Sequence, residues 1–314
     1  MATPFGRVLT AMVTPFTATG VLDEEGARRL ADHLVASGSE GIVVNGTTGE
    51  SATTSDREKE RVLRAVVEAV GDRAHVLAGV GTNDTAHTVE LAQAAAKAGA
   101  RGLLVVTPYY NRPPQEGLLR HFTTVADATD LPVMLYDIPA RTGVAIETET
   151  LLRLAEHPRI VANKDAKGDL AAASQVIARS GLAVYSGEDA LALPLLAVGA
   201  AGIVSVVNHV AGRELAAMVT RFCAGDSVGA LALHQQLLPI FRGLFRTQGV
   251  ILTKAALAML GLPGGPVRLP LVDATEQQRA TLRADLAAAG ITGVTTGGTT
   301  GGTIAATAVH GGLG

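Results

Sequence analysis

The feature that most constrains this sequence is a regular alternation between short apolar runs and longer stretches rich in alanine and leucine. Eight such runs fall within about 210 residues, and each is nearly continuous in apolar residues, as in parallel strands covered on both faces. The stretches between them show the spacing of amphipathic helices. The runs are Val8–Val13, Gly41–Val44, Ala74–Val80, Gly102–Val106, Leu131–Tyr136, Ile160–Ala162, Leu182–Tyr185 and Gly202–Val207.

Helices are expected between the runs, which makes each pair a strand–helix unit of a parallel sheet. The clearest are Asp56–Val70, Thr85–Ala98, Gly117–Ala128, Thr148–Glu156, Asp169–Arg179 and Asp189–Val198. Eight units predict an α/β fold, the closed (β/α)8 TIM barrel, which usually takes about 250 residues. An open doubly wound sheet would carry a Gly-x-Gly-x-x-Gly turn after an early strand. Gly79–Asp84 begins that way but has an aspartate in place of the last glycine, so the barrel is favoured.

The sequence after the eighth run predicts helices with no strands between them, over Arg213–Ala224, Val228–Thr247, Val250–Leu260 and Glu276–Ala289. We expect the barrel, with the reacting groups, in residues 1–225, and a C-terminal helical appendage in residues 226–290. Residues 291–314 are rich in glycine and threonine and are expected to form a flexible tail with no part in the chemistry.

Composition excludes several classes of protein. The chain has 26 basic and 29 acidic residues, a net charge of −3, and no basic cluster, so no nucleic-acid partner is expected. Cys223 is the only cysteine, which excludes a disulfide scaffold and fits a reducing compartment. The eight histidines have no metal-ligand spacing, so no metal site is expected.

Two segments bear on location. Met1–Phe16 lacks the basic and then long apolar pattern of a signal peptide. Ala190–Gly212 carries no charged residue over nearly the length of a membrane span, but Pro194, Gly199 and Asn208 interrupt it. We interpret that segment as a buried helix followed by a buried strand, and we expect a soluble, cytoplasmic protein with no membrane partner.

Polar or glycine-rich segments follow several of the expected strands. In TIM-barrel enzymes the reacting groups lie at this end of the barrel, where the strands lead into the loops. The segments are Asn45–Ser51, Thr107–Asn111, Tyr136–Gly143, Asn163–Lys167 and Ser186–Asp189.

Lys164 is the leading candidate for a nucleophile because it directly follows a short apolar strand. The other lysines lie on expected helices or in a polar loop: Lys59, Lys97, Lys167 and Lys254. An amine must be partly desolvated, or lie near other cations, to lose its proton near neutral pH. Lys164 would then attack a keto group and form a Schiff base. The alternative is a structural ion pair with Asp165 or another nearby acid, and position alone leaves both open.

Other polar residues near these strand ends suit small anionic substrates. Thr47 and Thr48, in a glycine-rich turn before a helix, offer backbone N–H groups and hydroxyls to a carboxylate, although a plain turn explains them as well. Arg141 can bind a carboxylate through two parallel hydrogen bonds, or lie in water at the surface. Tyr136 and Tyr110 can carry protons, or simply pack at the rim.

Taken together and in order, these motifs resemble the dihydrodipicolinate synthase family, within the pyruvate-dependent class I aldolases, over residues 5–289. The most specific are Gly46–Ser51, Thr107–Pro113, Tyr136–Gly143, Lys164–Ala166 and Ser186–Asp189. The resemblance implies a lyase that needs no separate cofactor. Lys164 forms a Schiff base with pyruvate, and the resulting enamine attacks L-aspartate 4-semialdehyde on the diaminopimelate route to lysine.

The resemblance also implies residue roles. Tyr136 would be the general acid and base, relayed through Thr47 to Tyr110, which a neighbouring subunit lends to the site. The family precedent is a homotetramer built as a dimer of dimers, and the shared tyrosine needs at least the dimer.

Binding roles follow from the same resemblance. Backbone groups of Thr47 and Thr48 would hold the pyruvate carboxylate, and Arg141 would hold that of the semialdehyde. Gly187 and Val204 would line the pocket, by a carbonyl group and by a side chain.

The sequence departs from the family pattern where inhibited members bind lysine. Asp56 and Lys59 stand in place of histidines, and His87 stands in place of an acid that would hold the ammonium group. Asn83, Ser51, Ala52 and Tyr109 match the family pattern. We expect lysine feedback to be weak or absent.

Two alternatives from the sequence remain. A sister lyase would cleave N-acetylneuraminate or a 2-keto-3-deoxy sugar acid through the same Schiff base, but such lyases generally lack an arginine at the position of Arg141. A barrel that only binds small acids, with Lys164 inert, is the non-catalytic alternative.

Overall fold

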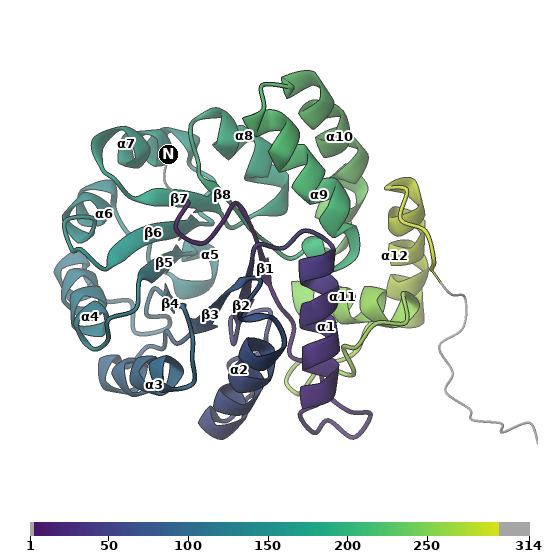
Figure 1. The fold of residues 1–314 in the computed structure, drawn as a ribbon, viewed down its shortest axis with the longest axis horizontal. Coiled ribbons are helices and arrows are strands. Elements are labelled where there is room, and N and C mark those ends of the chain that lie inside the picture. Colours follow the sequence, from purple (N-terminus) through teal and green to yellow (C-terminus); the bar gives the residue numbers. More distant parts are fainter. Residues whose placement is uncertain (1–2, 295–314) are drawn as a thin grey trace, which may run out of the picture.

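The computed structural model of this protein describes residues 3–294, which contain a closed barrel of eight parallel strands paired in sequence order (Figure 1). The expected (β/α)8 barrel is confirmed. The strands are β1 (Val8–Ala11), β2 (Gly41–Val44), β3 (His75–Gly79), β4 (Gly102–Val106), β5 (Val133–Asp137), β6 (Ile160–Asp165), β7 (Ala183–Ser186) and β8 (Gly202–Ser205).

Helices connect successive strands and cover the outside of the barrel (Figure 1). Several begin at side-chain caps that the sequence provides; Ser55 and Glu58 form a reciprocal capping box at the start of the second. They are α1 (Glu24–Ala36), α2 (Asp56–Val70), α3 (Thr85–Lys97), α4 (Gln115–Asp127), α5 (Pro139–Thr142), α6 (Thr148–Leu154), α7 (Leu170–Arg179) and α8 (Ala192–Ala197), the last preceded by the 3-10 turn η1 (Asp189–Leu191).

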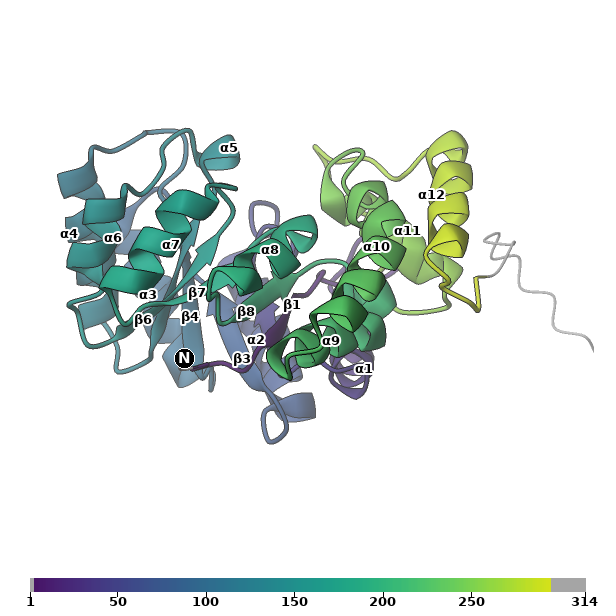
Figure 2. The ribbon, with the colours of Figure 1, turned by 90° about the horizontal axis from the view of Figure 1, so that it is seen from above.

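The C-terminal part adds four helices on one side of the barrel: α9 (Asn208–Cys223), α10 (Ser227–Gly243), α11 (Gly249–Met259) and α12 (Glu276–Ala288). Figure 2 shows α10, α11 and α12 together at the end of the molecule opposite α4 and α6. Leu237, Ile240 and Leu257 belong to the same buried apolar cluster as the outer faces of the strands. The helices therefore pack as part of the main core.

Several boundaries differ from the expected ones, and two of these differences are larger or bear on the site. Helix α9 begins at Asn208 and bends at Ala211, so it starts five residues before the expected Arg213. Strand β6 continues to Asp165, because its pairing with β5 and β7 runs on through Asp137 and Ser186. Lys164 therefore lies within the strand and not after it.

The register of β6 decides which way its side chains face, because successive residues of a strand point to opposite sides. Lys164 is paired with Tyr136 of β5 and Tyr185 of β7. Tyr136, Tyr185 and Ala162 belong to the cluster that fills the barrel, so Lys164 points inward as well. Asn163 points outward, toward the helices.

The segment Ala190–Gly212 forms α8 and β8, as expected, and its last five residues form the start of α9. No helix among residues 3–294 is long and apolar enough to cross a bilayer. The proposed boundary at residue 225 falls in the turn between α9 and α10. Most of the expected tail, residues 295–314, lies outside the described residues.

Candidate active site

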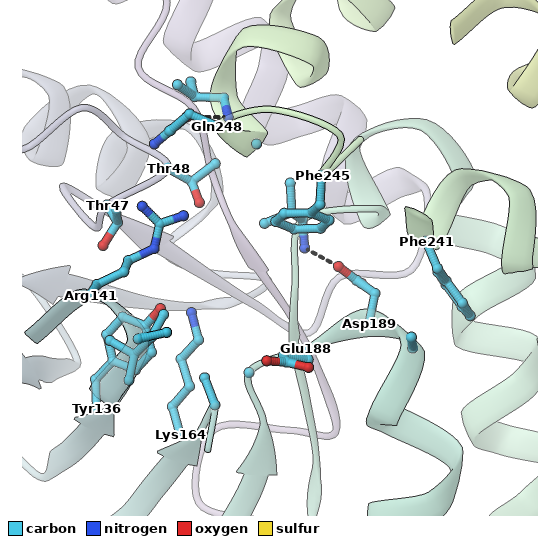
Figure 3. A pocket seen from close by; sticks show the side chains of 18 residues that line it. Thr47, Thr48, Tyr136, Arg141, Lys164, Glu188, Asp189, Phe241, Phe245 and Gln248 are labelled. Carbon is cyan, nitrogen blue, oxygen red and sulfur yellow. Dashed lines mark hydrogen bonds between the residues drawn. The ribbon is translucent and has the colours of Figure 1, made fainter. Parts of the chain in front are cut away.

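A cavity of about 360 Å³ opens at the carboxyl ends of the strands (Figure 3). Its walls come from the loops after β2, β5, β6, β7 and β8 and from the C-terminal segment that joins α10 to α11. Six of the eight candidate residues line it: Thr47, Thr48, Tyr136, Arg141, Lys164 and Gly187. The barrel thus brings together residues that are scattered over 140 positions of the sequence.

Among the described residues, Lys164 is the buried lysine that lines this cavity. Only 5% of the residue is exposed. Its Nζ lies 4.1 Å from the centroid of the Tyr136 ring, and no hydrogen bond or ion pair holds it among the described residues. The pKa of Lys164 is lowered to about 8, mainly by burial; the Asp189 carboxylate opposes this shift and the Arg141 cation adds to it. About a tenth of the molecules therefore carry a neutral amine at pH 7.

The structural ion pair considered for Lys164 is not formed. The Asp165 carboxylate instead accepts a hydrogen bond from the backbone N–H of Lys167, at 3.0 Å. The Lys167 ammonium lies 3.1 Å from Oδ2 of the buried Asp137 and donates to the carbonyl of Ile146. The Lys167 amine is therefore held by Asp137 and Ile146 beside the site, whereas the Lys164 amine has no such partner among the described residues.

Tyr136 lies beside this amine and is buried. Burial raises the pKa of its phenol to about 12; Arg141 and the Thr47 hydroxyl lower it, and Glu188 raises it. The phenol is therefore protonated at neutral pH, with a hydroxyl that can donate a proton and receive one back.

Arg141 lies in α5, a single turn that Pro139 starts and that Gly143, at φ 78°, ends. Such a short turn lifts the guanidinium over the cavity, where Figure 3 shows it above Tyr136. No acidic side chain of the described residues pairs with Arg141. A free guanidinium of this kind is suited to bind the carboxylate of a ligand.

The loop that holds Thr47 and Thr48 has an unusual backbone. Asn45 and Glu50, at its two ends, have the positive φ angles of 58° and 55°. Gly49 packs closely, since an added Cβ would lie 3.2 Å from both Asn45 N and Met12 O. The Thr14 hydroxyl also donates to the Gly49 carbonyl, at 2.6 Å. The loop is held in one shape by contacts on several sides.

Gly187 and Val204 lie at different depths. A Cβ on Gly187 would come within 3.2 Å of Lys164 Cε, so glycine leaves room for the amine. Val204 is 1% exposed, within the cluster that fills the barrel, and the described cavity wall from β8 is formed by Val206.

Tyr110 does not reach the cavity of its own chain. The residue is 90% exposed and has a positive φ of 74°, a strained conformation for a tyrosine. A second cavity of about 250 Å³ shares Thr47 and Tyr136 with the first and is also lined by Tyr109, which precedes Tyr110 in the same loop. Thr47 and Tyr136, two residues of the expected proton relay, are therefore connected by this cavity to the loop that carries Tyr110.

The residues considered for lysine binding do not share one cavity. Ser51, Ala52 and Tyr109 line the second cavity. Asp56 and Lys59 line another, between α2 and α3, where His87 lies 2.9 Å from Asp56 and Lys59 donates to the Thr54 carbonyl.

Several cavity residues were missed by the sequence analysis, above all those of the C-terminal part. Phe241 and Phe245 lie across the cavity from Arg141, and Gln248 lies above Thr48 (Figure 3). No sequence motif marks these three residues, and the sequence predicted the helices around them only as a C-terminal appendage. Asp189 was noted only as part of a motif. It is buried, and its carboxylate accepts hydrogen bonds from the Ser205 hydroxyl and from two backbone N–H groups of the loop after β8.

A (β/α)8 barrel with one unpaired, buried lysine in a cavity at its catalytic end defines a class of enzyme that acts through an amine nucleophile. The model of the Dihydrodipicolinate synthetase family matches residues 4–289. The chain belongs to this family, and the resemblance seen in its motifs is confirmed.

Relatives with assigned names support the same family. A 4-hydroxy-tetrahydrodipicolinate synthase of Acidothermus cellulolyticus is 70% identical over 289 residues, covering 92% of this chain and 94% of that protein. One of Streptomyces coelicolor is 68% identical, covering 92% of this chain and 97% of that protein. Among solved structures, dihydrodipicolinate synthase of Cyanidioschyzon merolae with lysine bound has a TM-score of 0.90 at 45% identity, covering 91% of this chain and 99% of that one.

Proposed function

We propose that this protein is a 4-hydroxy-tetrahydrodipicolinate synthase, a lyase that condenses pyruvate with L-aspartate 4-semialdehyde. The observation that carries the proposal is the amine of Lys164, buried and unpaired among the described residues, beside a protonated tyrosine and below a free guanidinium. The names of relatives up to 70% identical over most of the chain support the choice of substrates.

The reaction begins at Lys164. Its neutral Nζ adds to the C2 carbonyl of pyruvate, and loss of water leaves an iminium ion. Removal of a proton from C3 converts the iminium to an enamine, whose C3 forms a bond with the aldehyde carbon of the semialdehyde. The amino group of the semialdehyde then attacks C2, closes the ring and releases Lys164.

Tyr136 is placed to handle the protons of these steps. Its hydroxyl donates when the carbonyl oxygen leaves as water, and the phenolate takes a proton back when the enamine forms. Thr47 would connect this hydroxyl to Tyr110 of a second chain, because Tyr110 of the same chain points away from the cavity. The site would then be complete only in an oligomer, for which we propose the homotetramer of the family, in the cytoplasm.

The anionic substrates have separate partners. Backbone N–H groups of Thr47 and Thr48 would bind the carboxylate of pyruvate, while Arg141 would bind that of the semialdehyde. Holding both reactants in place removes most of the entropic cost of bringing them together. No further cofactor is needed, because the lysine itself supplies the electron sink.

The test is reduction with borohydride in the presence of pyruvate, followed by mass spectrometry of the peptides. We expect a single adduct, on Lys164. The trapped enzyme should be inactive, while the untreated enzyme should consume pyruvate with aspartate semialdehyde and not with N-acetylmannosamine or an aldose as acceptor. An adduct on another lysine, or turnover with the sugars alone, would contradict the proposal.

We also propose that lysine inhibits this enzyme weakly or not at all. His87 and Lys59 both engage Asp56, so an incoming ammonium group would meet a lysine and no unpaired acid. An inhibition curve with half of the activity lost at sub-millimolar lysine would refute this.

A further inference from the structure

Glu50 and Lys254 form a buried ion pair between the catalytic loop and the C-terminal helices. Glu50 ends the loop that carries Thr47 and Thr48, and Lys254 lies in α11. The Lys254 Nζ is 2.6 Å from Glu50 Oε1, and the two side chains are only 2% and 1% exposed. Neither residue lines the cavity of Lys164 among the described residues.

Both partners are held from other directions as well. Lys254 donates to the carbonyl of Pro266 at 2.8 Å, and its Nζ lies 4.2 Å from the ring centroid of Phe16. The second carboxylate oxygen of Glu50 accepts from the backbone N–H of Arg268, at 2.9 Å. Among residues 3–294, both polar partners of the Glu50 carboxylate therefore come from the segment after α10, more than 200 positions along the chain.

Glu50 is directly coupled to the substrate-binding turn. Its backbone N–H donates to the Thr47 carbonyl at 3.1 Å, and its own carbonyl accepts from Thr53 at 2.9 Å. Its φ of 55° is costly for a residue with a side chain, and such a conformation persists only where the surroundings impose it. The side-chain contacts with the C-terminal part hold Glu50 in this conformation together with the backbone hydrogen bonds of the loop.

We infer that Lys254 is a positioning residue for pyruvate binding: by fixing Glu50, it sets the orientation of the Thr47 and Thr48 backbone N–H groups. A buried ion pair adds little stability compared with apolar residues of the same volume, so a geometric role explains it better than stability does. The inference rests on the proposed function, and it makes the C-terminal helices part of the catalytic apparatus.

The test compares wild type, Lys254→Met and Asp285→Asn. Asp285 of α12 pairs with Arg246, in the segment that joins α10 to α11, and has no polar contact with the catalytic loop among the described residues, so its variant is the matched control. The concentration of active sites is set in each case by borohydride trapping at saturating pyruvate. We expect the KM for pyruvate to rise about tenfold in Lys254→Met, with kcat per trapped site within about threefold of wild type, and no change of KM in Asp285→Asn.

A second variant separates position from stability. Glu50→Gln/Lys254→Met leaves no unpaired charge buried, so it should recover the thermal midpoint that Lys254→Met loses while keeping the raised KM. A wild-type KM in either folded variant, or an equal rise in Asp285→Asn, would overturn the inference. Failure of wild type to form any adduct with pyruvate would refute the proposed function instead, so the two failures are distinguishable.

Discussion

Lys164 and Lys254 are equally buried, at 5% and 3% exposure, but one lies in the barrel and the other at its junction with the C-terminal helices. Burial lowers the pKa of both amines. Lys254 has Glu50 at 2.6 Å, whereas Lys164 has a tyrosine ring and no acid in direct contact. We infer that the acidic partner makes Lys254 a structural residue, whereas Lys164, without such a partner among the described residues, is free to act as a nucleophile.

Removing the unpaired amine should have the largest effect on activity. Lys164→Met is expected to lower turnover at least about a thousandfold, since the covalent step has no substitute. Its free energy of unfolding should be unchanged or higher, because an uncompensated polar group leaves the interior. Steady-state kinetics and urea unfolding measure both; activity near that of wild type would end the assignment of Lys164 as nucleophile.

The pH dependence of adduct formation tests why this amine reacts. The pKa of Lys164 is lowered to about 8 from 10.5, so its neutral fraction rises about fiftyfold between pH 6 and pH 8. The rate of borohydride trapping with pyruvate should follow that rise and level off above pH 8.

Arg141→Gln provides the comparison for this profile, because it removes a cation that lowers the pKa. Its midpoint should move to higher pH. In the wild-type chain, the lowered pKa of Lys164 also affects folding. The unfolded chain keeps the Lys164 proton up to a higher pH than the folded chain does, so the contribution of Lys164 to the free energy of unfolding increases as pH rises from about 8 toward 10.5. A trapping rate that does not change between pH 6 and pH 9 would contradict the assignment.

The paired lysine should show the opposite pattern in stability. Lys254→Met strands the Glu50 carboxylate and should lower the free energy of unfolding by about 3–5 kcal/mol. Glu50→Gln/Lys254→Met should recover most of that loss. Urea unfolding at one fixed protein concentration measures both free energies of unfolding. If Lys254→Met is as stable as wild type, the buried Glu50 carboxylate does not depend on Lys254.

The smallest effect is expected next to Lys164. Asn163 faces the opposite way, between Leu135 and Val184, and neither polar atom of its amide has a partner among the described residues. Asn163→Val should raise the free energy of unfolding by about 1 kcal/mol. Asn208, whose amide donates to Thr10 and Ser39, serves as the control, since Asn208→Leu should lower it.

Sequence reasoning singled out Lys164 as a candidate nucleophile, and the structure places it, buried, in the cavity wall; the surroundings of Lys164 were not predicted. The position of Lys164 after an apolar run was visible because strands and loops leave a local pattern. Whether its ammonium would pair with Asp165 was not visible, since Asp165 turned out to bind the Lys167 backbone. The cavity wall formed by Phe245 and Gln248 left no local signal at all.

By itself the sequence determined the alternation of strands and helices, and with it a barrel that carries Thr47, Tyr136 and Lys164 at the carboxyl ends of its strands. Apolar periodicity records which face of each element is buried, and that suffices for a repetitive fold. Only the tertiary structure decided which buried charges have partners. Pairs such as Glu50 and Lys254 join residues far apart in the chain, and the desolvation that lowers the pKa of Lys164 comes from every element packed around it.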